Sequence, residues 1–453
     1  MATWYMRLRR ALRQESENAR LAHLRETLRT GLWFVPAVFV AGATVLAIAS
    51  MALDRRLDGE PGWFVFNGGP TSAQQILATI VTSMLTFTGL VFTITVVTLQ
   101  LASSQFSPRV LRSFLRDRGS QVSLGVFTAT FVFALVVLSQ VRTGAVGAAF
   151  VPRLSVSLTF GLVITSLVTF IYYVNHITQA IRVVNIIDSI AEETSASLDR
   201  VWTVDPGIEM PNKVADLGAC RQVISLEGRD GVLAGLDIGG LVELARRHDC
   251  VFRLVADMGD FVANGAPLIE VLGGRTDVAP ANLLDQMDFG RERSMRQDPA
   301  YGFRQLVDIA ERALSPSLND PTTAIQTIDR LHGLLRRVAT RPQPTGAYCD
   351  SDGDLRFMRS IVGWRGLVTL SFEEIREYGS SSIQVHRRLR AAITDLIDVA
   401  PTDRMPPLQR QLHLLDESVR RSFHEPEERQ LAAQGDESGI GTEEVSDAGE
   451  VEG

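Results

Sequence analysis

Long apolar runs separated by short polar segments dominate the first two fifths of the chain. Residues 61–108 contain no Asp, Glu, Lys or Arg, and neither do residues 154–181. A helix that crosses a bilayer needs about 20 mostly apolar residues. Four stretches meet this requirement, namely residues 32–53, 76–102, 121–141 and 154–177. Lipid offers backbone polar groups no partner, so each stretch is expected to be a continuous helix. The pattern predicts a four-helix membrane domain over residues 32–181.

Arginines are distributed unequally around these four spans. Seven precede the first span, at positions 7, 9, 10, 13, 20, 25 and 29. Four lie between the second and third spans, and the other two loops hold two each. Cytoplasmic loops carry the excess of basic residues. We therefore expect both termini to lie in the cytoplasm of a bacterial inner membrane, with residues 1–31 as a basic cytosolic helix.

A helical period continues beyond the fourth span. Ile177, Ile181, Val184, Ile187 and Ile190 are spaced by three or four residues, which is typical of one face of a helix. The pattern predicts one long helix that leaves the membrane, with residues 182–205 as a linker to the cytosolic region. Such a helix either transmits movement or acts as a rigid spacer.

Residues 206–276 have the short β-prone runs and frequent glycines of a small β-rich domain. The piece "GDFVANGAPLIEVL" resembles the signature of barrel-sandwich folds such as biotinyl and lipoyl domains. Those domains carry their cofactor on a lysine, and this piece contains none. The resemblance therefore implies a barrel-sandwich-like fold and no cofactor.

Residues 277–425 return to a helical period and predict a helical cytosolic domain. Asp298–Pro299 and Asp320–Pro321 each place an N-cap Asp before a Pro at the first helical position. "SPSLN" separates the two starts, so a helical hairpin is expected. The last segment, residues 426–453, is rich in acidic residues and glycine and is expected to be a disordered tail.

A polar cluster is expected at this hairpin. Arg304, Asp308 and Arg312 follow one another at intervals of four and share a helix face. The turn brings Asn319 and Asp320 towards the end of that helix. Two interpretations stay open: a structural ladder of ion pairs, or a polar pocket in which the arginines bind a small anion or nucleotide-like ligand.

The second span carries a stripe of small and hydroxyl-bearing residues. At about 100° per residue, its members fall within a sector roughly 80° wide; they are Thr79, Thr82, Thr86, Gly89, Thr93 and Gln100. Thr88 and Thr95 lie nearly opposite and are expected to bond to backbone carbonyls one turn earlier. The stripe either lines a water-filled path without introducing charge or serves close packing between helices.

Composition excludes several classes of function. Of the net charge of −7, the last 29 residues contribute −9, with ten acidic residues and one Arg, so the rest is near neutral. A general nucleic-acid binder is therefore not expected. Three isolated cysteines argue against a disulfide framework, and seven scattered histidines against a metal site. Since no nucleophile–base or paired-carboxylate arrangement emerges, we predict no catalytic residues and no cofactor, and an enzyme is the least favoured of the function classes that stay open.

Three motifs resemble those of an uncharacterised bacterial family of predicted four-span inner-membrane proteins. They are "LQLASSQFSPRVL", "DPAYGFRQLVDIAERALSPSLNDPTTA" and "IREYG". The resemblance implies membrane topology and no particular activity. The expected fold is a membrane α-helical bundle followed by a cytosolic α+β region. The expected function is a gated pore or passive transport protein, as a homo-oligomer in the lipid bilayer with a possible ion or small ligand. The alternative is a membrane-anchored sensor or scaffold whose cytosolic domain binds a small ligand or protein.

Overall fold

The structure of the chain is a computed structural model. It describes residues 33–56, 66–105, 118–142, 150–180, 182–202 and 219–441. The described residues divide into two compact units between Asn185 and Ile186. We call them the membrane unit and the C-terminal unit and describe each by itself. The helix predicted over residues 1–31 lies outside the described residues.

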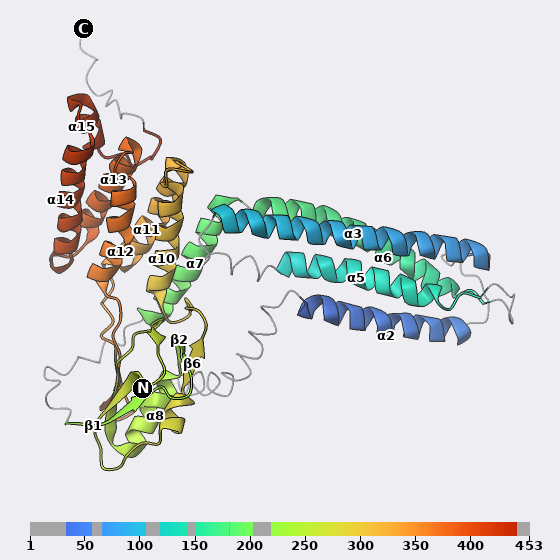
Figure 1. The fold of residues 1–453 in the computed structure, drawn as a ribbon, viewed down its shortest axis with the longest axis horizontal. Coiled ribbons are helices and arrows are strands. Elements are labelled where there is room, and N and C mark those ends of the chain that lie inside the picture. The colour runs from blue at the N-terminus through green and yellow to red at the C-terminus, as the bar shows by residue number, and fades with distance from the viewer. Residues whose placement is uncertain are drawn as a thin grey trace, which may run out of the picture. The chain divides into compact units, whose positions relative to one another are not determined.

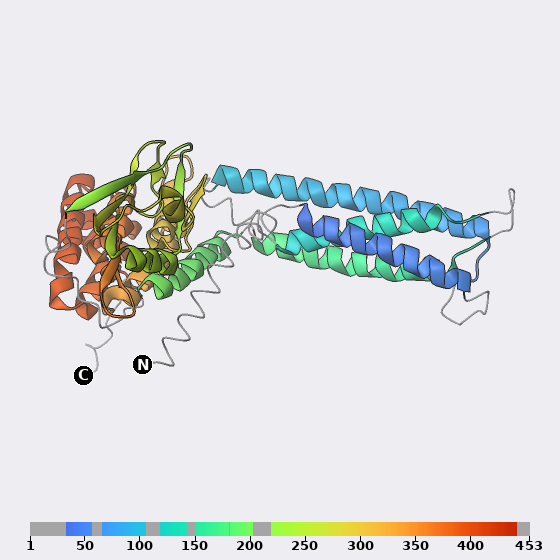
Figure 2. The same ribbon diagram turned by 90° about the horizontal axis from the view of Figure 1, so that it is seen from below.

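Four helices make up the membrane unit: α2 (Phe34–Arg56), α3 (Pro70–Gln105), α5 (Arg118–Leu138) and α6 (Arg153–Ala180). Each is long and apolar enough to cross a membrane, which confirms the four predicted spans. They run alongside one another in both views (Figures 1 and 2). The helices begin and end up to six residues away from the predicted limits, because an apolar run marks only the part that lipid surrounds. Thus α3 begins at Pro70, a residue favoured at the first helical position.

Helix α5 packs against the other three membrane helices. Its buried face combines Phe127 and Phe133 with small or hydroxyl-bearing residues, which are Ser120, Ser123, Gly125, Ala129, Thr130 and Ala134. Small side chains let helices approach closely in lipid. At Gly125 a Cβ would lie 3.0 Å from Cγ of Phe39 on α2. The close-packing face of this bundle therefore lies on α5.

The single long helix predicted after the fourth span is interrupted, so that prediction was wrong. Helix α6 ends at Ala180 and α7 (Val183–Val201) begins three residues later. A new first turn forms there, with the Asn185 N–H donating to the Arg182 carbonyl at 3.0 Å. Helical periodicity of apolar residues cannot reveal such a break, because two short helices in succession keep almost the same spacing.

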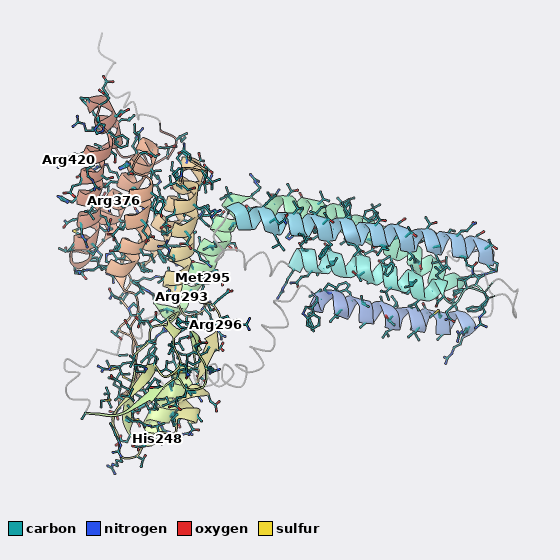
Figure 3. The ribbon with its side chains drawn as sticks, in the orientation of Figure 1. His248, Arg293, Met295, Arg296, Arg376 and Arg420 are labelled. Carbon is teal, nitrogen blue, oxygen red and sulfur yellow. The ribbon has the colours of Figure 1, made fainter. Side chains whose placement is uncertain are left out.

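Within the C-terminal unit, α7 is attached along its length. Asp188 pairs with Arg330 at 2.5 Å, and Asp199 pairs with Arg337 and Arg341 at 2.6 and 2.8 Å. These three arginines belong to α11 (Pro321–Ala339) or directly follow it. The Ser197 hydroxyl donates to the carbonyl of Met295, which lies near the start of α10 (Figure 3). The part of α7 from Asp188 to Asp199 is therefore fixed to this unit.

Two sheets form the β-rich part of the C-terminal unit. Five strands have the order β1-β5-β3-β8-β7, with β3 and β8 parallel and the other neighbours antiparallel. Three more have the order β4-β2-β6 and are antiparallel. The strands are β1 (Cys220–Ser225), β2 (Gly231–Leu236), β3 (Cys250–Leu254), β4 (Phe261–Val262), β5 (Pro267–Gly273), β6 (Met287–Gly290), β7 (Ala347–Cys349) and β8 (Leu355–Met358).

The expected α+β class is confirmed, and the described strands close no barrel. The signature piece forms β4 and β5, which join different sheets around one apolar core that includes Leu233, Phe252 and Leu268. Helix α8 (Ile238–His248) packs on β3 and β8 and begins at Asp237, whose carboxylate accepts from the Gly240 N–H. Strands β6 to β8 come from residues 277–425, which were predicted to form a helical domain. Within this segment the piece "LRFMRSIVGW" suggests a short strand before two helices, and β8 confirms it.

Helices build the rest of the C-terminal unit: α9 (Pro280–Leu284), α10 (Pro299–Ala313), α11, α12 (Trp364–Tyr378), α13 (Ile383–Val399), a 3₁₀ turn η2 (Thr402–Arg404), α14 (Met405–Ser422) and α15 (Pro426–Ala432). The predicted caps are confirmed. Asp298 accepts from the Tyr301 N–H, and Asp320 from the Thr323 N–H. The expected hairpin of α10 and α11 forms, and Asn319 turns the chain with a φ of 46°.

The acidic tail was predicted to be disordered from residue 426, and this is wrong for residues 426–441. Helix α15 packs against α13 and α14 (Figure 1), and Ala432 is fully buried. The chain then continues along α13 through hydrogen bonds of Asp436 that composition could not reveal. The remaining twelve residues lie outside the described part.

Candidate functional site

The six stripe residues of α3 are all exposed within the membrane unit. The packed residues of the same helix recur every seven positions at Leu77, Met84, Val91 and Thr98. At about 100° per residue, this packed line lies on the side of α3 opposite to the stripe. The stripe therefore faces none of the other described helices of its own unit. Any helix that packs on it lies outside the described helices of this unit.

The hydroxyls along α3 use their protons within the helix. Thr79, Thr82, Thr86 and Thr93 each donate to the carbonyl four residues earlier, at 2.8 to 3.1 Å. Each oxygen keeps its acceptor capacity on the outer face. Gly89 has nothing within 4 Å of the place where a Cβ would stand. The stripe is thus a shallow, uncharged strip of hydrogen-bond acceptors.

Thr88 and Thr95 face the packed side, and both donate to the carbonyl four residues earlier, as predicted. The Thr95 hydroxyl also lies 2.8 Å from the hydroxyl of Tyr173, a fully buried residue of α6. A second buried pair joins Thr130 of α5 and Ser166 of α6 at 2.9 Å. The sequence reveals neither pair, because periodicity assigns a residue to a face and does not say which helix covers that face.

Asp54 is a further polar group that the sequence patterns do not single out. It lies in the last turn of α2 and accepts the N–H groups of Leu154 and Ser155 at 2.8 and 3.0 Å and the Ser155 hydroxyl at 2.6 Å. These donors belong to the first turn of α6, where the helix dipole favours an anion. Asp54 therefore caps a neighbouring span. The signal for it in the sequence is a single carboxylate directly after the apolar run of residues 32–53.

Arg304 is the centre of the cluster on the C-terminal hairpin. Its Nε donates to Asp308 at 2.5 Å, one terminal nitrogen donates to Glu311 at 2.8 Å, and the other donates to Glu374. All three guanidinium nitrogens thus go to carboxylates, and three carboxylates surround one cation. An added anion would meet net negative charge, so the arrangement favours the ion-pair ladder over the anion pocket.

The other members of the predicted cluster lie further along the hairpin. Arg312 is exposed on α10. Asn319 and Asp320 form the turn before α11, where the Asp320 carboxylate accepts from the backbone and hydroxyl of Thr323. The structure therefore brings together Arg304 and Asp308, and it adds Glu311 and Glu374. Glu374 comes from α12, 70 residues along the chain, which no local pattern could indicate.

Glu311 is the group of this cluster with the strongest pH response. Burial and a hydrogen bond with Glu374 raise its pKa from 4.5 to about 7, against the opposing effect of Arg304. Because the pKa is higher in the folded chain, protonated Glu311 contributes its full stability below about pH 4.5. This contribution is lost as the pH rises through 7.

We expect Glu311→Gln to raise the thermal midpoint at pH 8 relative to the unmodified chain and to leave little difference at pH 5. A free-energy change on the order of 2 kcal/mol follows from the shift after allowance for solvent screening. Thermal unfolding between pH 5 and 8 measures it. Glu427→Gln, at an exposed position in the first turn of α15, is the control. Parallel pH profiles for both variants would show that Glu311 ionises normally.

No group of three or more His, Cys, Asp or Glu side chains with the geometry of a metal site occurs among the described residues. Of the two polar features predicted from the sequence, the stripe on α3 is the one whose residues are all exposed.

Comparison with known proteins places the chain among uncharacterised membrane proteins. The family model described as "Predicted membrane protein (DUF2254)" matches residues 29–395. "Uncharacterized protein Rv1290c" of Mycobacterium tuberculosis and "Uncharacterized protein Mb1321c" of Mycobacterium bovis are each 31% identical over 421 residues. Each match covers 89% of this chain and 79% of the relative. No solved structure matches the chain.

Proposed function

This chain belongs to the DUF2254 family of predicted membrane proteins, and we propose that it forms a homo-oligomeric gated pore or passive transport path. In this proposal the α3 helices of several copies meet through their stripes and line the path. The C-terminal unit regulates it from the cytoplasmic side of a bacterial inner membrane. An ion or a small polar solute is the cargo.

The observation that carries the proposal is the position of the stripe opposite the packed face of α3. Only a small share of α3 is buried in its own unit. Its outer face mixes hydroxyls with exposed Leu85, Leu90 and Phe92. Contacts between copies would cover this face and bring the threonine oxygens to a common axis. Oxygen acceptors without charge suit a water-filled path.

The lack of charge favours a passive path over a proton-coupled one. Proton-coupled transporters usually need a titratable group inside the membrane. Residues 61–108 and 154–181 contain no acidic residue, lysine or arginine. Asp54, a carboxylate in the last turn of α2, accepts hydrogen bonds from the first turn of α6. A channel or gated passive path is therefore the better match.

The orientation belongs to the same proposal. Eleven of the fifteen arginines around the spans lie before the first span or between the second and third, and basic loops stay in the cytoplasm. This distribution supports cytosolic termini and a cytosolic C-terminal unit. Protease access from either side of sealed inverted vesicles measures it.

A sensor or scaffold is the second candidate, favoured by the connection between α6 and α7. Only two residues separate the last span from a helix that ion pairs fix to the C-terminal unit. In this interpretation the short connection would carry a movement of α7 to α6. A ligand or protein bound to the C-terminal unit would then act on the membrane helices without any cargo.

Liposome flux tests the pore. We expect the unmodified chain to release an entrapped ion, and Thr86→Leu with Thr93→Leu to reduce the rate at least about tenfold, since leucine replaces acceptors with apolar groups. Thr165→Leu with Thr169→Leu is the matched control, because these α6 residues, one exposed and one half-buried, donate to the same kind of carbonyl. Flux no higher than from empty vesicles, under several voltages and tensions, would remove the pore proposal.

Cross-linking separates the two candidates. We expect Thr93→Cys to form dimers under mild oxidation and Thr169→Cys to form none above the background of the three native cysteines. Cross-linking at residue 93 without flux would support an oligomeric sensor whose stripe is a packing contact. Equal cross-linking at both positions would contradict the α3 interface itself.

A further inference from the structure

The segment after α15, residues 433–441, lies along the C-terminal unit, and we call it the strap. Its sequence is AQGDESGIG. The Asp436 N–H donates to the carbonyl of Arg387 on α13, at 3.2 Å. In return the Arg387 guanidinium donates to the Gly441 carbonyl at 3.0 Å, and the Gln384 amide to the Gly439 carbonyl at 2.7 Å. Both ends of the strap are thus bonded to one side of α13.

Asp436 gives the strap its shape. Its carboxylate is buried and accepts from the Ser438 hydroxyl at 2.8 Å and from the N–H groups of Gly439 and Gly441 at 2.9 and 2.6 Å. Burial works to raise its pKa, but these hydrogen bonds outweigh burial and lower it. The carboxylate therefore remains ionised at neutral pH and closes the strap into a compact loop.

Gly439 determines how closely the strap approaches the helices. It has a φ of 69°, a region that L side chains rarely adopt, and a Cβ there would lie 2.8 Å from Ile325 Cγ2 on α11. Gly435 differs, because a Cβ there would make an ordinary contact of 3.7 Å with Ala391. The close packing of the strap on α11 and α13 thus requires glycine at residue 439, whereas residue 435 has room for a Cβ.

The strap is held mainly by polar contacts and buries little apolar surface. Ile440 is 75% exposed. Segments with few apolar contacts open locally at low free-energy cost. Beneath the strap lies Arg387, less than a tenth exposed, and its charge helps to lower the pKa of Asp436. The neighbouring Arg388 is paired with Asp329 at 2.5 Å. The acidic strap therefore covers one buried arginine of α13.

We propose that this surface of α13 and the first turns of α11 is a peptide-binding site, with the strap as its releasable intramolecular ligand. When the strap leaves, the site takes an extended acidic segment of the same chemistry, with glycine at the close approach. This proposal is independent of whether the membrane unit conducts.

Amide hydrogen exchange on the full chain in nanodiscs tests the docked strap. Gly439→Val introduces a β-branched side chain at positive φ and a contact with Ile325, so the strap should undock. We expect exchange in residues 436–441 to become at least about tenfold faster, with α11 and α12 unchanged. Gly435→Ala is the matched control and should exchange like the unmodified chain. Equal protection in both variants would overturn the proposal.

A peptide added in trans tests the site. The probe is a fluorescent peptide of residues 433–442. A tethered segment has an effective concentration in the millimolar range, so the unmodified chain should bind the probe at least about tenfold more weakly than the Gly439→Val chain. A probe with Asp436→Asn should bind neither. If exchange shows an undocked strap and the probe at about 1 mM still does not bind, the strap is only a structural cap and the proposed site is absent.

Discussion

Gly302→Ala will lower the thermal midpoint of the chain by roughly 6 to 12 °C, for a loss of about 3 kcal/mol. A Cβ at Gly302 would lie 1.9 Å from the Oγ1 and 2.8 Å from the Cβ of Thr194 on α7. Thr194 is fully buried and donates to the Ile190 carbonyl, so it has nowhere to move. The helices α7 and α10 must separate to admit the methyl group.

The sign of this effect is informative, because alanine normally improves on glycine in a helix by about 1 kcal/mol. Gly333→Ala in α11 is the matched control, since nothing lies within 4 Å of a Cβ there, and it should raise the midpoint slightly. Thr194→Ala removes the closest atom and should recover part of the loss in the double variant. A rise in the midpoint for Gly302→Ala would show that α7 does not pack closely on α10.

Asp54→Ala will destabilise the membrane unit by about 3 kcal/mol, because it leaves three donors of α6 without their acceptor. Hydrogen bonds to a charged group are worth about 1.5 to 3 kcal/mol each, and their losses do not add fully. Unfolding in mixed micelles with increasing SDS, followed by loss of helicity, measures the change.

Two variants make the Asp54 result specific. Asp54→Asn keeps one oxygen acceptor and should lose about half as much. Arg56→Ala, at an exposed position two residues further along α2, should change the midpoint little. If Asp54→Ala and Arg56→Ala unfold at the same SDS fraction, the carboxylate does not hold the start of α6.

The elements with strong local signals could be predicted from the sequence. The four apolar runs specify spans because burial in lipid leaves a helix as the only structure that satisfies the backbone. Asp298 and Asp320 each combine a side-chain acceptor with a proline that lacks an N–H, so both helix starts were foreseeable. The pairing of Arg304 with Asp308 follows from the helix period alone.

What could not be predicted depends on contacts between distant segments. The stripe on α3 is real as a pattern, but its exposure follows from α5 occupying the opposite face. Glu311 and Glu374 come together only because α12 packs on α10. The strap has the composition of a disordered tail, and one carboxylate with two glycine N–H groups orders it. Composition averages over such single residues.

The parallel pair of β3 and β8 has a consequence for synthesis of the chain. Residues 250–254 leave the ribosome about a hundred residues before their neighbour at 355–358. Until then β3 presents an open edge, which can pair with the edge strands of other nascent chains. In detergent micelles, a chain that stops at residue 276 keeps this edge permanently and should aggregate, whereas one that continues through residue 358 should aggregate less. The β-rich part is therefore completed late, only after the α10–α11 hairpin has been made.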